Sequence, residues 1–505
     1  MVNNVTKKLI LIAYIIIFLN ASMIAQAAIS DPNENQKNTE IQSQEQPLNT
    51  INSKTSEIVG KIGDYTIRKN QLEKRLISEL YPDPYEPYNE DAVLPDANSV
   101  LMSMLEEKAM IMEARNLNYQ EKENIKRLVD DTRNKRIINL LTENYLKQNA
   151  DKLAVPESEI EQKIKADPNL SKEQVIEALK TQKARNLLNQ YYKEIYKNLK
   201  VKKITENFPK AIKVHDRLLN HPIKKENIRF IRRYQIMDET TEDEKNIVLA
   251  TFTGGKITLL DWFETLHGLS PPSRPKDLNT IKGFDKLLER ALTIPLLVTE
   301  AKLQGLDKNP DMLKKIKDYE DSCLLNEFRN EKRKEVNEPT AEEVQDYYNN
   351  HKKIFNDKKL RIDQIWCSDL DTAKQAKAEL DEGKDFEDVK QQYSLSKNSK
   401  PFDTYPHNQG LFWKDLWKGE PNEIIGPIKG FYNSSEIKWR VVKILEKEPG
   451  NILEYSTNLE NAIKNLITTQ KSDALLEKCG RELLKKYPHE IFPDRIKDIN
   501  PLNIP

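Results

Sequence analysis

A glutamine and an arginine interrupt apolar rows in two predicted strands. In the segment LRIDQIWC, strand alternation places Gln364 in one row with Leu360 and Ile362. In the segment EIKWRVVKILE, it places Arg440 in a row with Val442. A glutamine donates and accepts hydrogen bonds but does not titrate, so Gln364 can hold part of a buried network and cannot shuttle a proton. An inward-pointing arginine is a permanent cation that needs a partner or solvent.

Other kinds of chemistry lack their motifs. The six histidines form no pair at metal-ligand spacing with each other or with the three cysteines. The sequence contains no Walker motif, no dinucleotide-binding glycine motif and no serine nucleophile elbow. We therefore expect no metal and no cofactor. His407, in the loop before QGLFW, is either an alternative polar group of a site or an exposed loop histidine.

The residues around Gln364 and Arg440 predict a small α/β domain. A strand is followed by a helix that Gly383 ends, and a second short helix carries Phe386, Val389 and Tyr393 on its buried side. The phrases QGLFW and NEIIGPI then precede the closing strand that carries Arg440.

This order resembles the parvulin-type (PpiC) peptidyl-prolyl isomerase domain, and the flanking helical segments resemble SurA- and PrsA-type extracytoplasmic foldases. The phrases FEDVKQQYS and NEIIGPI carry the likeness best. Rotation about an X–Pro bond has a barrier of roughly 20 kcal/mol. The resemblance implies that such domains lower this barrier without a cofactor, by holding the proline ring in an apolar pocket and biasing hydrogen bonds around the amide.

The positions that the resemblance assigns to catalysis are substituted here. The family carries a histidine in the first strand, a second histidine in the closing strand, and an acidic residue or cysteine after the Tyr-Ser phrase. These positions correspond to Gln364, Arg440 and the stretch Leu395–Ser396, so none holds the family residue. The family also places a helix before the GEIxGP phrase, whereas only KDLWKGEP connects Trp413 to Asn422. We therefore expect a degenerate domain with weak or no isomerase activity.

An aromatic cluster begins within the QGLFW phrase. It consists of Phe412, Trp413, Leu416 and Trp417. Two interpretations stay open: the cluster forms a binding surface for apolar peptide segments, or it fills the space left by the missing helix.

The first residues predict export. Lys7 and Lys8 precede the run LILIAYIIIFL, and Ala25 and Ala27 have the spacing that signal peptidase accepts. We expect a signal peptide over residues 1–27, with an uncleaved N-terminal anchor as the alternative. The expected location is periplasmic or otherwise extracytoplasmic. Beyond that possible anchor, no membrane contact of the mature chain is expected.

The bulk composition limits the partners. Lys and Arg total 80, as do Asp and Glu, so no net charge attracts nucleic acid. At 505 residues the chain is too long for one hydrophobic core. The expected partners are therefore proteins, either unfolded clients or the subunits of a complex.

An internal duplication organises the helical part. The phrases GDYTIRKNQL and GGKITLLDWF each predict a turn, a short strand and a helix start, and MIMEARNLNY and LLVTEAKLQGL follow them at similar spacing. The predicted fold is α+β and mostly helical, with duplicated SurA-N-like arms plus the small parvulin-like α/β domain. The expected segments are a signal peptide (1–27), a disordered tether (28–55), a first helical foldase-like domain (56–205), a second helical repeat (206–340), the degenerate parvulin-like domain (341–449) and a C-terminal helical segment (450–505).

Two functions of different classes fit these features. One is an exported foldase or chaperone of the parvulin family that binds unfolded or extended polypeptide with weak or no isomerisation. The other is a non-catalytic scaffold that organises subunits of a larger extracytoplasmic complex.

Overall fold

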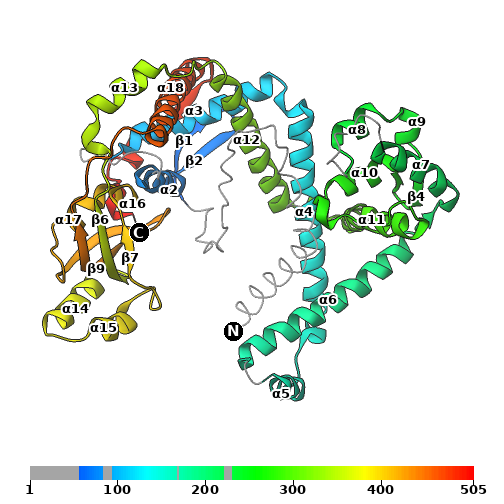
Figure 1. The fold of residues 1–505 in the computed structure, drawn as a ribbon, viewed down its shortest axis with the longest axis horizontal. Helices are drawn as coiled ribbons and strands as arrows, with labels where there is room; N and C mark the ends of the chain where they lie inside the picture. Colours follow the sequence, from blue (N-terminus) through cyan, green and yellow to red (C-terminus); the bar gives the residue numbers. More distant parts are fainter. Residues whose placement is uncertain (1–55, 83–93, 168–169, 221–229, 505) are drawn as a thin grey trace. The chain divides into compact units, whose positions relative to one another are not determined.

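The computed structural model describes residues 56–82, 94–167, 170–220 and 230–504. The predicted signal peptide and tether therefore lie outside the described residues. The fold is α+β and mostly helical, with three small antiparallel sheets, as the sequence predicts (Figure 1). The described chain forms two compact units, one within residues 126–320 and the other within residues 56–125 and 321–504.

A β-hairpin followed by two helices opens the second of these units. Strands β1 (Ile58–Ile62) and β2 (Tyr65–Arg68) pair through a turn at Gly63, whose φ of +50° suits glycine. Helix α2 (Lys69–Leu80) and helix α3 (Ala97–Asn116) follow, and Asp96 caps α3 by accepting a hydrogen bond from the Ser99 amide. We call β1, β2, α2 and α3 the first hairpin module.

The other unit contains the same order of elements. Strands β4 (Val248–Phe252) and β5 (Gly255–Thr258) precede α10 (Leu259–His267) and α11 (Ile281–Leu303). Both hairpins carry a register shift near the start of the first strand. We call β4, β5, α10 and α11 the second hairpin module, and its agreement with the first confirms the predicted duplication of the helical arms.

The remaining helices connect and cover these modules. Helices α4 (Glu123–Gln148) and α12 (Pro310–Arg333) follow the two modules in the chain. The others are α5 (Glu157–Ala166), α6 (Lys172–Asn198), α7 (Phe208–Leu219), α8 (Arg233–Asp238), α9 (Glu242–Lys245), α13 (Ala341–Asn350) and α18 (Thr457–Lys486). The predicted final helical stretch is thus one helix, α18.

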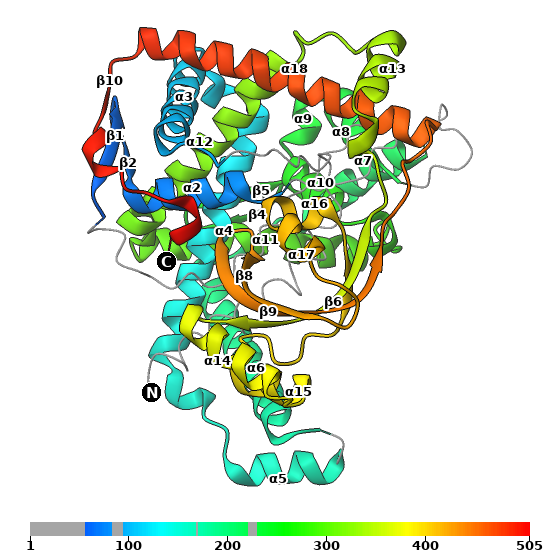
Figure 2. The same ribbon diagram turned by 90° about the vertical axis from the view of Figure 1, so that its left-hand side faces the viewer.

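Each module is closed by a long helix and a short strand from elsewhere in the chain. Strand β10 (His489–Ile491) follows α18 and pairs with β1, and α18 packs on α3 (Figure 2). Strand β3 (Lys202–Lys203) follows α6 and pairs with β4, and α6 packs on α11. The compact units therefore group α6 with the second module and α18 with the first, so they do not follow the linear order of the segments predicted from the sequence.

A four-stranded antiparallel sheet builds the domain around Gln364 and Arg440. Its strand order is β7 (Phe402–Thr404), β6 (Lys359–Cys367), β9 (Glu436–Glu448) and β8 (Ile424–Asn433). Helices α14 (Leu370–Asp381) and α15 (Phe386–Tyr393) cover one face (Figure 1). The short helices α16 (Pro406–Gln409) and α17 (Trp413–Trp417) lie between β7 and β8 in the chain.

The two faces of this sheet have separate apolar cores. Ile365, Cys367 and Val441 pack against α14 and α15, and Phe386 and Val389 are buried there as predicted. On the other face, the core consists of Leu360, Ile362, Trp413, Leu416, Val442 and Ile444. Gln364 and Arg440 belong to the second face, whose core includes Trp413 and Leu416 of the short helix α17.

In the described part of the chain, none of the helices has both the length and the apolar character required to cross a bilayer.

Candidate functional site

The sheet register brings Gln364 and Arg440 together. On the central strand pair, Gln364 lies opposite Val442 and Trp366 lies opposite Arg440. The Arg440 Nη1 atom donates a hydrogen bond to Gln364 Oε1 over 3.0 Å. The structure therefore joins two of the residues that the sequence singled out in one buried contact.

Arg440 is fully enclosed by neutral groups. Only 1% of the residue is exposed, and its Nη2 atom donates to Gln409 Oε1 over 2.9 Å. The guanidinium carbon lies 5.0 Å from the centre of the Trp366 ring. A Cβ placed on Gly430 would lie 2.5 Å from Arg440 Cζ, so the guanidinium packs directly on the backbone of β8.

The electrostatics of this cluster are those of a buried cation. Among the described residues, no carboxylate forms an ion pair with Arg440, and its Nε atom has no hydrogen-bond acceptor. Burial lowers the pKa of Arg440 from 12.5 to about 9, and the more distant charge of Asp415 opposes this shift. The guanidinium stays protonated at neutral pH, held by two amide oxygens and an aromatic face.

Ser396 lies beside this cluster, and its hydroxyl contacts Tyr432 rather than Arg440. Its hydroxyl is 3.2 Å from the hydroxyl of Tyr432, and the Tyr432 ring packs edge-on against Trp366 at 5.5 Å. Ser396 is thus linked to the Arg440 cluster indirectly, through Tyr432 and Trp366.

The opposite face of β6 carries a buried ion pair. Lys390 Nζ lies 2.7 Å from Asp363 Oδ1 and donates to the Ser399 carbonyl oxygen over 2.5 Å. Asp363 also accepts the Gln364 amide. Because each charge is compensated, this pair fixes α15 and the loop after it against the strand.

Most side chains of the aromatic cluster are buried in the core of the domain. Phe412, Trp413 and Leu416 are buried, and Trp417 is partly buried and stacks on Trp413 at 5.3 Å. Trp413 and Leu416 pack against Leu360 on the same sheet face as Gln364. This packing is what the second interpretation expects, in which the cluster fills the space of the missing helix, while a peptide-binding role for these residues stays a prediction.

The arrangement offers hydrogen bonds and a fixed positive charge but no titrating group at neutral pH. Gln364 and Arg440 cannot exchange a proton at that pH. His407 stacks on Tyr405 at 5.5 Å, and burial lowers the pKa of its imidazole. None of the contacts described for His407 joins it to Gln364 or Arg440.

Sequence reasoning missed three members of the cluster, Gln409, Gly430 and Tyr432. Gln409 Nε2 also donates to Thr404 Oγ1 over 2.8 Å, which orients the amide oxygen towards Arg440. The only sequence signal for Gln409 was its place before the QGLFW aromatics, and Gly430 had no signal because its role is to lack a side chain.

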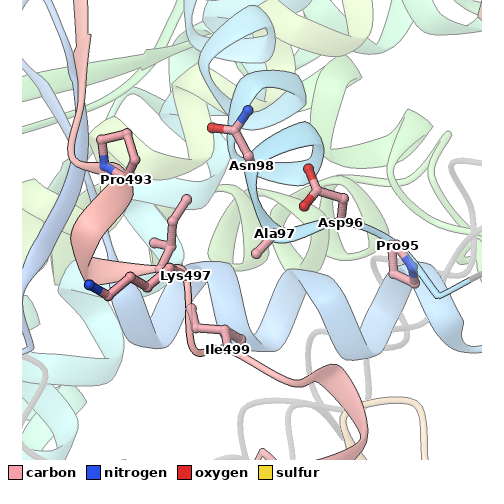
Figure 3. A pocket seen from close by; sticks show the side chains of 8 residues that line it. Pro95, Asp96, Ala97, Asn98, Pro493, Lys497 and Ile499 are labelled. Atoms are coloured by element: carbon pink, nitrogen blue, oxygen red, sulfur yellow. The ribbon is translucent and has the colours of Figure 1, made fainter.

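A cavity of about 380 Å³ lies in the first hairpin module, away from these residues (Figure 3). It is lined by residues 95–98 at the start of α3 and by Pro493, Ile496, Lys497 and Ile499 of the C-terminal segment. Asp96 turns towards the helix start, where it caps α3. No residue predicted from the sequence lines this cavity.

Comparison with known proteins gives a family match over one part of the chain. Residues 339–457 match the PPIC-type PPIASE domain. Two curated relatives are foldase proteins PrsA. The protein of Clostridium kluyveri is 27% identical over 141 residues, which are 26% of this chain and 38% of that protein. The protein of Geobacillus sp. is 28% identical over 166 residues, which are 32% of this chain and 56% of that protein.

Solved structures with some likeness include one reported for the SurA-like chaperones PEB4 and Cj1289 of Campylobacter jejuni, with 17% identity and a TM-score of 0.24. That match covers 48% of this chain and all of the other. PrsA from Bacillus subtilis has 20% identity and a TM-score of 0.18, covering 46% of this chain and 89% of the other.

Proposed function

Residues 339–457 belong to the PPIC-type family of parvulin domains, and from this premise we propose that the chain is an exported parvulin-family foldase with weak or no isomerase activity. It binds unfolded or extended polypeptide as a chaperone. The observation that carries the proposal is the buried Arg440 guanidinium, which occupies the place where the family resemblance puts a catalytic histidine.

The loss of isomerase activity follows from what the site can hold. Arg440 donates to Gln364 and Gln409, so the amide oxygens of both side chains are engaged by the guanidinium. Trp413 and Leu416 fill the sheet face beside them. A proline ring would have to displace packed side chains, and no imidazole is present to bias the hydrogen bonds of the twisted amide.

Client binding is supported by apolar side chains that the helices leave exposed. Within residues 126–320, exposed fractions reach 67% for Leu303, 61% for Ile281 and 55% for Tyr234. Ile294 and Leu313 are also exposed. Apolar positions spread over several helices suit weak, sequence-tolerant contacts with unfolded chains better than one specific partner.

An extracytoplasmic location is part of the proposal. It is supported by the predicted signal peptide and by the resemblance to PrsA-type foldases. The alternative of an uncleaved anchor would keep the chain at the membrane surface and leave the client-binding role unchanged.

The test is suppression of aggregation. The purified chain at micromolar concentration should slow the aggregation of several unrelated denatured proteins, and it should not accelerate the cis–trans isomerisation of a proline peptide. Acceleration that Gln364→Ala abolishes would contradict the inactive site. A chain that ignores denatured proteins but co-purifies stoichiometrically with one set of partners would instead support the scaffold role, which the loss of catalytic residues and the second hairpin module also fit.

A further inference from the structure

A Tyr–Pro pair of the first hairpin module contacts the PPIC-type domain. Helix α2 ends at Leu80, and the Tyr81 amide still donates to the Ile77 carbonyl oxygen over 3.0 Å. Tyr81 has φ −66° and ψ 125°, the extended conformation that a residue before proline prefers. The pair Tyr81–Pro82 therefore leaves the helix as an extended aromatic–proline dipeptide.

Two phenylalanines of the domain receive this dipeptide. The Tyr81 ring meets Phe431 edge-on, with ring centres 5.2 Å apart at 74°. Phe431 in turn meets the buried ring of Phe412 edge-on at 4.9 Å. Such edge-to-face contacts are the favourable geometry for aromatic pairs, so the contact is more than loose proximity.

Gly410 lies beside the proline ring. Its φ of +51° lies in the region that favours glycine. A Cβ on Gly410 would lie 3.4 Å from Pro82 Cβ and 3.5 Å from Phe431 Cε2. The backbone at Gly410, the Phe431 ring and the Phe412 ring thus form one surface under the dipeptide, which we call the aromatic–glycine surface.

This surface adjoins the Arg440 cluster in sequence on both sides. Gln409, which precedes Gly410, and Gly430, which precedes Phe431, both contact the guanidinium. The guanidinium therefore contacts both segments that carry the surface, through a hydrogen bond at Gln409 and through packing at Gly430. Arg440, at the position where the family resemblance puts a catalytic histidine, thus supports a binding surface.

A second contact joins strand β8 to the C-terminal segment that packs on the first hairpin module. Lys429 Nζ donates to the Leu502 carbonyl oxygen and, over 2.7 Å, to Asn503 Oδ1. Residues 496 to 504 pack on the apolar core of the module. Two residues of β8, Lys429 and Phe431, therefore fasten the domain at two points.

We propose that the aromatic–glycine surface is a binding site for aromatic–proline segments and that Tyr81–Pro82 is its built-in occupant. Extended proline segments lose little conformational entropy on docking to aromatic surfaces, which is why this pair can serve as an intramolecular latch. An external segment of the same chemistry competes for the surface and releases α2 from the domain. The site differs from the exposed helices proposed to bind clients, so it stands whether or not the chain suppresses aggregation.

The test is binding of a labelled peptide to the full chain. The probe is a fluorescein-labelled LISELYP peptide, the sequence of residues 76–82, followed by fluorescence anisotropy. Pro82→Ala should raise the affinity about three- to tenfold, because a tethered competitor acts at an effective concentration in the millimolar range. Phe431→Leu, added to Pro82→Ala, should remove the gain. Gln190→Ala, at an exposed glutamine of α6, should behave like the unmodified chain.

Two outcomes would overturn the proposal. One is equal affinity of the unmodified chain and Pro82→Ala, including the case in which neither binds. The other is equal binding of a LISELYA peptide, since the proline ring would then not be recognised. As a measurement that does not depend on a foldable variant, excess LISELYP should increase amide hydrogen exchange of residues 78–81 in the unmodified chain, and unchanged exchange would count against the latch.

Discussion

Arg440 Nη1 lies 3.0 Å from Gln364 Oε1, and this hydrogen bond joins the two strand positions at which the parvulin resemblance puts histidines. A titratable pair is thereby replaced by a permanent cation and a neutral amide. The pair can support structure but cannot move a proton at neutral pH. A buried guanidinium needs compensating contacts. Gln409 provides a hydrogen-bond acceptor, and Trp366 provides an aromatic face.

Replacing Gln364 should lower the stability of the domain, because the buried Arg440 cation loses a hydrogen-bond acceptor. Gln364→Leu removes one of the two amide oxygens that accept hydrogen bonds from the guanidinium and should lower the free energy of unfolding by about 2–3 kcal/mol. Adding Arg440→Met removes the cation itself and should recover at least half of that loss. Urea denaturation followed by tryptophan fluorescence measures both, because Trp366, Trp413, Trp417 and Trp439 all lie in this domain.

A matched control is Gln392→Leu, at an exposed glutamine of α15, which should change stability by less than about 0.5 kcal/mol. Additive effects of Gln364→Leu and Arg440→Met would show that the two side chains are not coupled.

A methyl group at Gly430 of β8 should displace the Arg440 guanidinium and lower stability. The new Cβ would lie 2.5 Å from Arg440 Cζ and 2.5 Å from Nε, so the guanidinium must move away from its acceptors. We expect Gly430→Ala to cost about 1–3 kcal/mol of stability in the same urea experiment. The loss should shrink in an Arg440→Met background, where a narrower side chain faces the strand. An undiminished loss there would place its cause in the backbone instead.

Much of the fold could be predicted because the signals are local. Gly383 has φ +91° and lies just after the end of α14, where the sequence predicted that the helix stops. Phe386 and Val389 are buried on α15, as their spacing predicted. The duplicated turn–strand–helix phrases correspond to the two hairpin modules. Apolar periodicity and turn residues determine such elements within a few residues of sequence.

The short strand that completes each hairpin module could not be predicted, because it depends on pairing between segments far apart in the chain. Strand β10 has three residues and pairs with β1 from the far end of the chain, and strand β3 has two residues. Strands this short carry no detectable alternation. Gln409 and Gly430 were missed for a related reason, since their role appears only when the β-sheet brings them to Arg440.

Stability should decrease at high pH because of Tyr65. Burial, and next the Asp321 carboxylate, raise the pKa of Tyr65 from 10 to about 12, and Tyr65 Oη donates to Asp321 Oδ1 over 3.1 Å. The unfolded tyrosine ionises from pH 10, whereas the folded one stays neutral until about pH 12. The contribution is therefore complete below pH 10 and is lost as the pH rises to about 12.

Tyr65→Phe should remove this dependence. Between pH 8 and pH 11 the unmodified chain should lose about 1 kcal/mol more stability than the variant, as measured by urea denaturation. Arg115, which also contacts Asp321, keeps the carboxylate paired in both proteins and makes the comparison specific to the hydroxyl. Parallel pH curves for the two proteins would contradict the assignment.

A tyrosine hydrogen-bonds each of the two long closing helices to its module, and we expect the two hydrogen bonds to contribute unequally to stability. Tyr487, just after α18, donates to Glu113 Oε2 over 2.6 Å and accepts from Asn116 Nδ2. Tyr191 on α6 accepts from Gln304 Nε2 over 2.9 Å. A hydrogen bond to a carboxylate contributes more than a neutral one, so Tyr487→Phe should cost about 1.5–3 kcal/mol and Tyr191→Phe about 0.5–1.5 kcal/mol. Amide hydrogen exchange measures each unit separately: the first variant should increase exchange in β1 and α3, the second in β4 and α11. Equal losses would contradict the predicted difference in strength, and a loss confined to the other unit would contradict the assignment of each tyrosine to its own module.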